Sequence, residues 1–309
     1  MISGVFDVGT QVIELFIFIL IGVIATKFKI LNQSGTTAIT NLIIYIISPC
    51  MIINAFQREY EPQMMKSLFW TFVCSVGILA FSVIIAELIF CKVKVDKAVV
   101  LKFATVFSNC GFMALPLQRQ LLGDEGVFYG AVFVAVFNIF IWSYGIILMS
   151  GEKNPKMMIK TLINPGIIGT LIGILFFVTS FRLPVVLSSC VESLAMMNTP
   201  LPMIVIGYFL AKSNLKKALF SGLAYLAISL RLVILPMIVL GVLYFVGVKD
   251  IILQALVISV CAPCASYTTM FSLKYNRDTE FSAEVVTLSN LYSLITIPLI
   301  VGLTQYILN

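Results

Sequence analysis

The sequence predicts an all-α, multi-pass membrane protein with ten transmembrane helices, built as two inverted repeats of five helices each. The first observation behind this prediction is composition: hydrophobic residues make up 60% of the chain and charged residues 11%, whereas ordinary globular proteins carry about 25% charge. The second is that long apolar runs follow one another with short connectors between them. The third is that two of these runs are broken by proline at matching places in the two halves of the chain.

Ten apolar stretches are long enough to cross the hydrocarbon core of a bilayer, which takes a helix of about 20 residues. The connectors between them are short and hold most of the charged residues, so we expect no soluble domain between these stretches. Numbered as spans 1 to 10, the stretches cover residues 8–26, 38–57, 67–90, 98–121, 126–149, 160–180, 186–211, 218–246, 251–273 and 283–307.

Basic residues are divided unevenly between the two sides of the expected bundle. The connectors after odd-numbered spans hold 14 of the 20 Lys and Arg residues, and those after even-numbered spans hold five. Cytoplasmic loops carry an excess of Lys and Arg, so we expect a cell-membrane protein with the odd connectors in the cytoplasm and both termini outside. The net charge of +6 follows from this topology. A basic face with interleaved aromatic residues, which nucleic-acid binding requires, is absent from the sequence.

The two halves, residues 1–150 and 151–309, are expected to form an inverted repeat. Five spans in each half start the second half on the opposite side of the membrane from the first. Three pairs of polar or helix-breaking residues recur at offsets of 147, 151 and 152 residues: Pro116 and Pro263, Pro49 and Pro200, and Asn138 and Asn290. Chance recurrence of prolines, which are common in membrane helices, is the alternative explanation.

The broken runs lie in spans 4 and 9, at Asn109–Pro116 and Cys261–Thr269. A proline in a helix frees polar backbone groups, which hydrocarbon cannot satisfy. If the two unwound segments cross near the midplane, their half-helix N-termini offer unpaired amides and positive dipole ends that suit a carboxylate. Ordinary proline kinks healed by neighbouring helices are the alternative. The candidate binding residues at the breaks are Asn109, Cys110, Gly111, Pro116, Pro263, Cys264, Ser266 and Tyr267.

Five further polar residues within the spans are functional candidates, because polar groups in hydrocarbon are costly. Asn138 and Asn290 follow the two breaks, in spans 5 and 10, and either line one cavity or join helices by hydrogen bonds. Arg231 lies at the centre of span 8, where it balances an anionic substrate or pairs with a carboxylate. Glu14 is the expected partner of Arg231 or a protonatable site, and Glu87 lies near the cytoplasmic end of span 3, where it can reach water.

Enzymatic and metal-dependent functions have little support in the sequence. The chain contains no histidine, which excludes His-assisted nucleophiles and His-containing zinc motifs. It has no phosphate-binding glycine loop of the ATPase type, and no span interior contains an aspartate. The pair Cys261 and Cys264 has the spacing of a redox or metal motif, but without a second ligand pair we interpret both as small packing residues. We therefore expect neither catalysis nor a bound cofactor.

The order and spacing of several short motifs resemble those of the auxin efflux carrier family, whose plant members include the PIN-type auxin carriers. The resemblance covers essentially all ten spans, and no single motif is decisive. The matching segments are Ile46–Cys50 around Pro49, Asn109–Pro116, Ile141–Tyr144, Asn164–Pro165, Ala262–Ala265, Lys274–Asn276 and Ile297–Pro298.

The resemblance implies ten spans in an inverted repeat with crossing broken helices at spans 4 and 9, as in bile-acid symporters and the antiporter NhaA. Spans 1, 2, 6 and 7 would form a scaffold, against which a transport domain of spans 3–5 and 8–10 moves. The implied substrates are organic anions, including auxin and mono- or dicarboxylates such as malate. Asn109 matches the family's crossover asparagine, which faces the substrate carboxylate, and a homodimer through the scaffold would fit the family.

Two departures from the family pattern matter for function. The long cytoplasmic loop of many plant members is missing between spans 5 and 6, so control by phosphorylation of that loop is not expected. Asn138 stands where plant carriers often have a glutamine, which leaves the substrate open. We expect an efflux carrier of small organic anions that works by alternating access. The alternatives are a sodium-coupled symporter of the bile-acid type and a membrane sensor that binds such an anion without moving it. The coupling ion, H⁺ or Na⁺, stays open.

Overall fold

The computed structural model describes residues 2–151, 165–212, 222–248 and 250–308. Asn164, expected at the start of span 6, lies outside these residues, as do most basic residues of the connectors after spans 5 and 7. The helical segments of the first half are α1 (Ile2–Lys27), α2 (Gln33–Leu42), η1 (Ile43–Ile47), α3 (Ser48–Ala55), α4 (Pro62–Ile89), α5 (Val95–Val106), η2 (Cys110–Ala114), α6 (Leu115–Phe140), η3 (Ile141–Gly145) and α7 (Ile146–Ser150). Those of the second half are α9 (Pro165–Thr179), α10 (Val185–Met196), α11 (Pro200–Lys212), α13 (Gly222–Ser229), η4 (Leu230–Ile234), α14 (Leu235–Val246), α15 (Asp250–Cys261), α16 (Tyr267–Lys274) and α17 (Thr279–Leu308).

The all-helical membrane class is confirmed. Within the described residues, regular structure is helical throughout, apart from one isolated β-bridge. Helical segments occupy each of the ten predicted ranges, and six of the described helices are long and apolar enough to cross a membrane. One of the six, Cys110–Ser150, is kinked where Gly123 adopts a φ of 66°. This kink lies between the predicted end of span 4 and the start of span 5. Ten crossings and an inverted repeat stay predictions.

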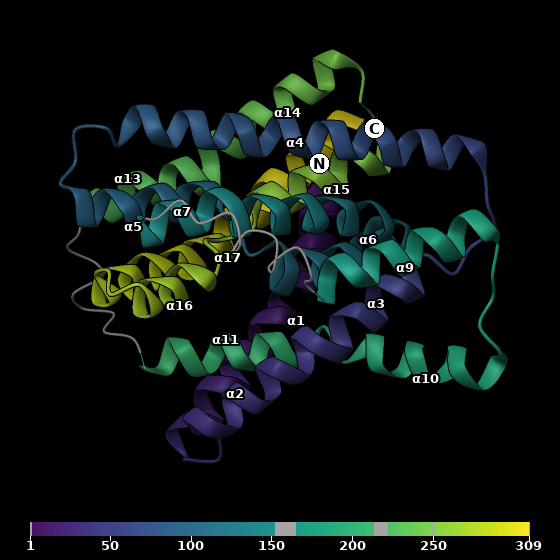
Figure 1. Ribbon diagram of the computed structural model, residues 1–309, viewed down its shortest axis with the longest axis horizontal. Coiled ribbons are helices and arrows are strands. Elements are labelled where there is room, and N and C mark those ends of the chain that lie inside the picture. The colour runs from purple at the N-terminus through teal and green to yellow at the C-terminus, as the bar shows by residue number, and fades with distance from the viewer. Residues whose placement is uncertain (1, 152–164, 213–221, 249, 309) are drawn as a thin grey trace.

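Helices on two opposite sides of the molecule are joined by others that lie between them. In Figure 1, α2, α10 and α11 lie along one side of the molecule, and α4, α13 and α14 lie along the other. α1 packs on α11, and α3 packs on α9 and α10. α6 packs on α4 and α15, and α15 packs on α17. Further contacts join α1 to α17 and α6 to α9.

The contact between α1 and α11 depends on two glycines. A Cβ atom added to Gly22 would lie 2.2 Å from the carbonyl oxygen of Ile204, and one added to Gly207 would lie 2.1 Å from that of Ile19. The two backbones therefore approach each other more closely than any larger residue permits. Small residues allow such close approach in membrane proteins, where apolar burial does not drive helix association.

Three π-helical turns of the described chain end two residues before a proline. η1 precedes Pro49, η2 precedes Pro116 and η4 precedes Pro236. Proline lacks the N–H that an α-helix requires and its ring clashes with the carbonyl four residues earlier, so a locally wider turn relieves both problems. The prediction that Pro116 marks the break in span 4 is wrong for this reason. The chain unwinds earlier, at Phe107–Asn109, and Pro116 lies in helix.

Candidate functional site

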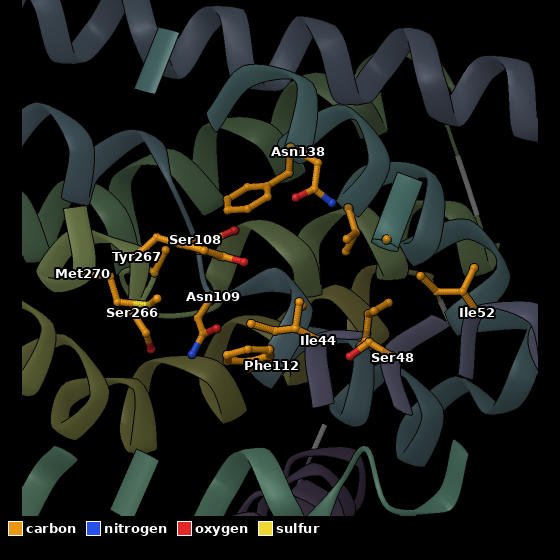
Figure 2. A pocket seen from close by; sticks show the side chains of 16 residues that line it. Ile44, Ser48, Ile52, Ser108, Asn109, Phe112, Asn138, Ser266, Tyr267 and Met270 are labelled. Atoms are coloured by element: carbon orange, nitrogen blue, oxygen red, sulfur yellow. The ribbon is translucent and has the colours of Figure 1, made fainter. Parts of the chain in front are cut away.

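The two broken segments cross each other as a short antiparallel bridge between Ser108 and Cys264. The N–H of Asn109 donates to the carbonyl oxygen of Pro263 at 2.7 Å, and the N–H of Ala265 donates to that of Phe107 at 2.9 Å. The first break separates α5 from η2, and the second separates α15 from α16. Figure 2 shows Ser108 and Asn109 of the first break beside Ser266 and Tyr267 of the second. Polar backbone groups freed by the breaks are thus partly satisfied by each other, as burial in hydrocarbon requires.

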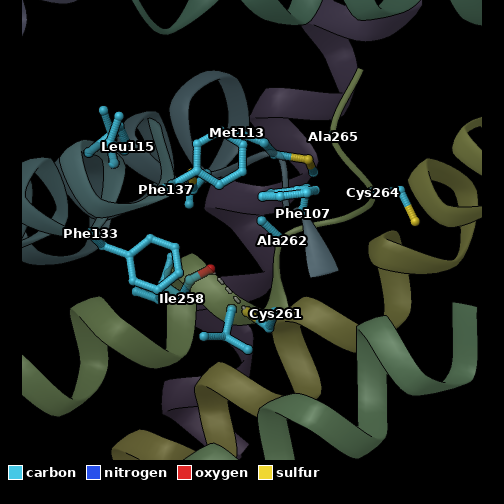
Figure 3. Packing of buried hydrophobic residues seen from close by; sticks show 14 of the residues in the cluster. Phe107, Met113, Leu115, Phe133, Phe137, Ile258, Cys261, Ala262, Cys264 and Ala265 are labelled. Carbon is cyan, nitrogen blue, oxygen red and sulfur yellow. Dashed lines mark hydrogen bonds between the residues drawn. The ribbon is translucent and has the colours of Figure 1, made fainter. Parts of the chain in front are cut away.

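Tight packing holds the crossing in place. Figure 3 shows Phe107, Met113 and Phe137 packed against the extended segment that contains Ala262 and Ala265, and all five side chains are buried. Their apolar contacts fix the position of the extended segments but cannot satisfy the remaining backbone donors there.

A hydroxyl group of α17 satisfies one of these donors. The buried Ser289 Oγ accepts a hydrogen bond of 2.8 Å from the N–H of Cys264. We expect Ser289→Ala to leave this buried N–H without a partner, which costs about 1–3 kcal/mol of stability. The unfolding temperature of the purified protein in detergent should therefore fall by several degrees.

Ser293→Ala is the matched control, because Ser293 is equally buried on the same helix but donates only to the carbonyl of Asn290, one turn earlier. An equal loss of unfolding temperature in both variants would show that Ser289 does not support the crossing.

Arg231 is buried beside the crossing, with 2% of its surface exposed. Its Nη1 donates to the carbonyl oxygens of Thr105, at 3.0 Å, and Val106, at 3.1 Å, and its Nη2 donates to that of Val260. These carbonyls belong to the last turns of α5 and α15, which are the negative ends of the two half-helices before the crossing. Arg231 thus caps both half-helices at once.

The expected pairing of Glu14 with Arg231 is wrong. Glu14 is exposed on α1, which packs on α11 and α17, whereas Arg231 is bonded to backbone carbonyls. Glu87 accepts hydrogen bonds from Lys102 Nζ, at 2.6 Å, and from the Tyr144 hydroxyl, at 2.7 Å. It therefore joins α4, α5 and η3, and its partner Tyr144 packs on Phe107 of the first break, with ring centroids 6.4 Å apart.

A small cavity of about 60 Å³ lies against the crossing. Asn109, Gly111 and Phe112 line it from the first break and the helix that follows, and Ser266 and Tyr267 line it from the second. The cavity thus faces the N-termini of the two half-helices after the crossing, where amides lack partners within the helix and the dipole is positive.

Two asparagines line this cavity from opposite sides. Asn138 of α6 lies across the cavity from Asn109 in Figure 2. Asn109 is 6% exposed, and its Nδ2 has no hydrogen-bond partner among the described residues. The side chain of Asn109 therefore adds a free donor to the backbone amides of the two helix N-termini.

A larger cavity of about 340 Å³ adjoins the first and shares Ile44, Phe112, Ser266 and Met270 with it. Its volume falls in the range of ligand pockets, about 300–1,000 Å³, whereas the first cavity alone is too small for a ligand of that kind. Asn290 lines this second cavity and not the first. Asn138 and Asn290 therefore face two adjoining cavities, and the expectation that they line one cavity is wrong. The polar residues of the second cavity are Gln33, Thr36, Thr37, Thr40, Asn41, Lys212, Ser266, Thr269, Thr287 and Asn290.

The structure brings together some of the sequence-predicted residues and separates others. Those lining either cavity are Asn109, Gly111, Asn138, Ser266, Tyr267 and Asn290. Those lying behind the cavities, in or near the crossing, are Cys110, Pro116, Pro263, Cys264 and Arg231. Cys110, Cys261 and Cys264 are buried, free thiols.

Sequence reasoning missed Gln118, Ser289 and the shared wall of the two cavities. Gln118 Nε2 donates to the Ala255 carbonyl at 2.7 Å and to Ser259 Oγ at 2.8 Å, which ties α6 to α15. A glutamine in an apolar run was a usable signal for Gln118. Ser289 carried no such signal, because serines are frequent in these spans.

Comparison with known proteins identifies the family of the chain. A family model described as "Membrane transport protein" matches residues 7–301. An uncharacterized transporter of Methanocaldococcus jannaschii is 24% identical over 301 residues, which cover 93% of this chain and 96% of that protein. An uncharacterized transporter of Methanothermobacter thermautotrophicus is 22% identical over 294 residues, which cover 93% and 95%. Because the family model matches nearly the whole chain, the chain belongs to the membrane transport protein family, that of the auxin efflux carriers.

Proposed function

We propose that this membrane transport protein is a secondary transporter that moves small organic anions, such as auxin-like acids or mono- and dicarboxylates, out of the cell by alternating access. The observation that carries the proposal is the polarity of the crossing. Two helix N-termini after the crossing and the free Nδ2 donor of Asn109 face one cavity, while Arg231 caps the C-termini of the two half-helices before the crossing. Each helix N-terminus corresponds to roughly +0.5 charge, so this cavity favours a carboxylate.

The charge of the lining residues supports an anionic substrate. Among the described residues that line the two cavities, Lys212 carries the one formal charge, and no aspartate or glutamate is present. We infer that the carboxylate sits at the crossing and that the body of the substrate extends past Phe112 and Met270 into the larger cavity. These two side chains belong to both cavities.

The architecture that we propose for this function has ten spans in two inverted repeats, residues 1–150 and 151–309. Spans 1, 2, 6 and 7 form the scaffold and spans 3–5 and 8–10 form the transport domain of an elevator. The packing of α1 on α11 and of α3 on α9 and α10, and that of α6 on α4 and α15, support this division. A hydrogen bond of 2.8 Å from Ser48 to Asn198 supports the repeat, because residues 150 positions apart meet there near the middle of spans 2 and 7.

Access to the cavities is expected from one side at a time. In the orientation that we propose, the basic connectors lie in the cytoplasm and the termini outside. The larger cavity then opens toward the cytoplasm, because Gln33 and Lys212 of the connectors after spans 1 and 7 line it. At the other side Phe128 of α6 packs on Phe56 and Phe177, with ring centroids 4.6 and 5.2 Å apart, and Arg58 lies 4.9 Å above the Phe128 ring. This aromatic cluster joins α3 and α9 to α6 and supports a conformation that is open inward and closed outward.

Uptake of radiolabelled malate or indole-3-acetate into proteoliposomes tests the proposal. We expect saturable flux of an organic anion that responds to an imposed voltage and to the substrate gradient. Saturable binding without flux under any imposed sodium, proton or voltage gradient would overturn transport and leave the sensor alternative. Flux that requires a sodium gradient would favour the sodium-coupled symporter.

A further inference from the structure

We propose that the guanidinium group of Arg231 is a permanent cation that positions the crossing. It occupies the place in which a transporter with discontinuous helices would otherwise bind a coupling ion. This inference rests on the proposed function for its meaning in transport. The geometry behind it is independent of substrate and direction. Arg231 is a positioning residue, because it lies behind the crossing and lines neither cavity.

The carbonyl groups around Arg231 form a site for a cation. Thr105, Val106 and Val260 present three carbonyl oxygens from the ends of two different half-helices to one guanidinium group. In transporters with discontinuous helices, unwound carbonyls and half-helix C-terminal ends coordinate Na⁺. Here the same type of ligand is already occupied by a side chain, which leaves no carbonyl of this set for an ion.

The charges balance without a carboxylate. Two helix C-termini together correspond to roughly −1 charge, which matches the single positive charge of the guanidinium. The ion pairs found among the described residues are Lys102 with Glu87, Arg119 with Asp124 and Arg277 with Asp96, and none of them includes Arg231. A buried charge is costly unless it is compensated, so the two helix ends are what makes this buried arginine stable.

The position of Arg231 in the chain also fits this role. It lies in the π-helical turn η4, which packs against α5, α15 and α17, the elements that meet at the crossing. The planar guanidinium group presents several N–H donors in a fixed, forked geometry, so one side chain can donate to carbonyls of both half-helices. Arg231 thus fixes the two C-terminal ends together and leaves the two N-terminal ends uncompensated for the anion. Transport by this protein should therefore not depend on sodium.

The inference is tested by removing the Arg231 side chain and adding small cations to the solution. Full-length Arg231→Ala and Arg231→Lys variants are purified in detergent, and thermal unfolding is measured with millimolar guanidinium chloride or with sodium or choline chloride at equal ionic strength. We expect the unfolding temperature of Arg231→Ala to fall by several degrees and to rise again with guanidinium but not with choline. Arg231→Lys should be intermediate, because an ammonium group is a compact point charge without the fork. The wild type should respond to none of these salts at millimolar concentration.

Arg119→Ala is the matched control, because Arg119 forms a partly exposed ion pair with Asp124 away from the crossing. Guanidinium should not restore any stability lost in this variant. Equal effects of guanidinium and choline on Arg231→Ala would overturn the inference. If Arg231→Ala cannot be purified, the test uses Arg231→Lys alone. An Arg231→Lys variant that is also unfolded would overturn the inference, because a second cationic side chain should partly replace the guanidinium.

Transport measurements separate this inference from the proposed function. In proteoliposomes we expect wild-type anion flux to be the same in sodium and choline, flux of Arg231→Ala to fall to near background, and guanidinium to restore it. Wild-type flux that requires sodium would overturn the inference while leaving anion transport established. Absence of flux in every variant, together with guanidinium rescue of unfolding temperature, would overturn the proposed function and leave the cation site established.

Discussion

Asn109→Ala is expected to abolish tight binding of the substrate anion while leaving the protein folded. The buried Nδ2 of Asn109 has no partner among the described residues and lines the cavity at the crossing, so it is free to donate to a carboxylate. A hydrogen bond to a charged group contributes about 1.5–3 kcal/mol, which corresponds to a loss of roughly 10- to 150-fold in affinity. Asn109→Asp should be more severe, because it places a negative charge against the anion.

The fold should survive both changes, because the crossing uses the backbone N–H of Asn109 and not its side chain. Calorimetric titration with malate and indole-3-acetate measures the affinity, and thermal unfolding measures the fold. Asn54→Ala is a suitable control, because Asn54 is a half-buried asparagine of α3 that lines neither cavity. Unchanged affinity in Asn109→Asp would show that the carboxylate does not bind at the crossing.

Gly207→Ala is expected to destabilise the protein strongly, although it adds only one methyl group. The new Cβ would lie 2.1 Å from the Ile19 carbonyl oxygen and 2.8 Å from the Cα of Gly22. Both neighbours are backbone atoms, so α1 and α11 would have to move apart. Overpacking of this kind typically costs about 1–3 kcal/mol and sometimes more, and the unfolding temperature should fall by roughly 2–4 °C for each kcal/mol.

Gly77→Ala and Gly241→Ala provide matched controls within helices α4 and α14. A Cβ at either position meets nothing within 4 Å, and alanine is a better helix former than glycine by about 1 kcal/mol. Both variants should therefore be neutral or slightly more stable in the same thermal measurement. A Gly207→Ala variant as stable as these controls would contradict the close approach of α1 and α11.

Much of the fold could be predicted from the sequence, because the bilayer imposes simple rules on composition and length. Each predicted span overlaps helical segments of the structure, and the break around Pro263 lies where the sequence placed it. The break in span 4 was misplaced because proline was taken as its cause. The wide turn η2 absorbs Pro116, and the chain unwinds at Phe107–Asn109 instead.

The candidate site was less accessible to sequence reasoning, because its contacts join residues far apart in the chain. The capping of two helix ends by Arg231 involves partners 126, 125 and 29 residues away, and nothing in the local sequence around Arg231 distinguishes this from an ion pair. The same holds for Ser289, whose partner Cys264 lies 25 residues earlier. By contrast, Asn109 could be identified from the sequence, because it lies at a helix break. The unpaired backbone groups of such a break need hydrogen-bond partners when they are buried in hydrocarbon.

The wide turns before Pro49 and Pro236 join two stretches of α-helix without a break, α2 to α3 and α13 to α14, and this has a consequence for how these helices present their surfaces. An α-helix rotates by about 100° per residue, and a π-type turn accommodates one residue more than the α-helical repeat. Beyond each such turn, the stripe of residues that faces the protein is shifted by one sequence position relative to the stripe before it. A single helix can thus present one periodic pattern to lipid along half of its length and another along the rest, and single-residue insertions among related chains are best accommodated at these two places.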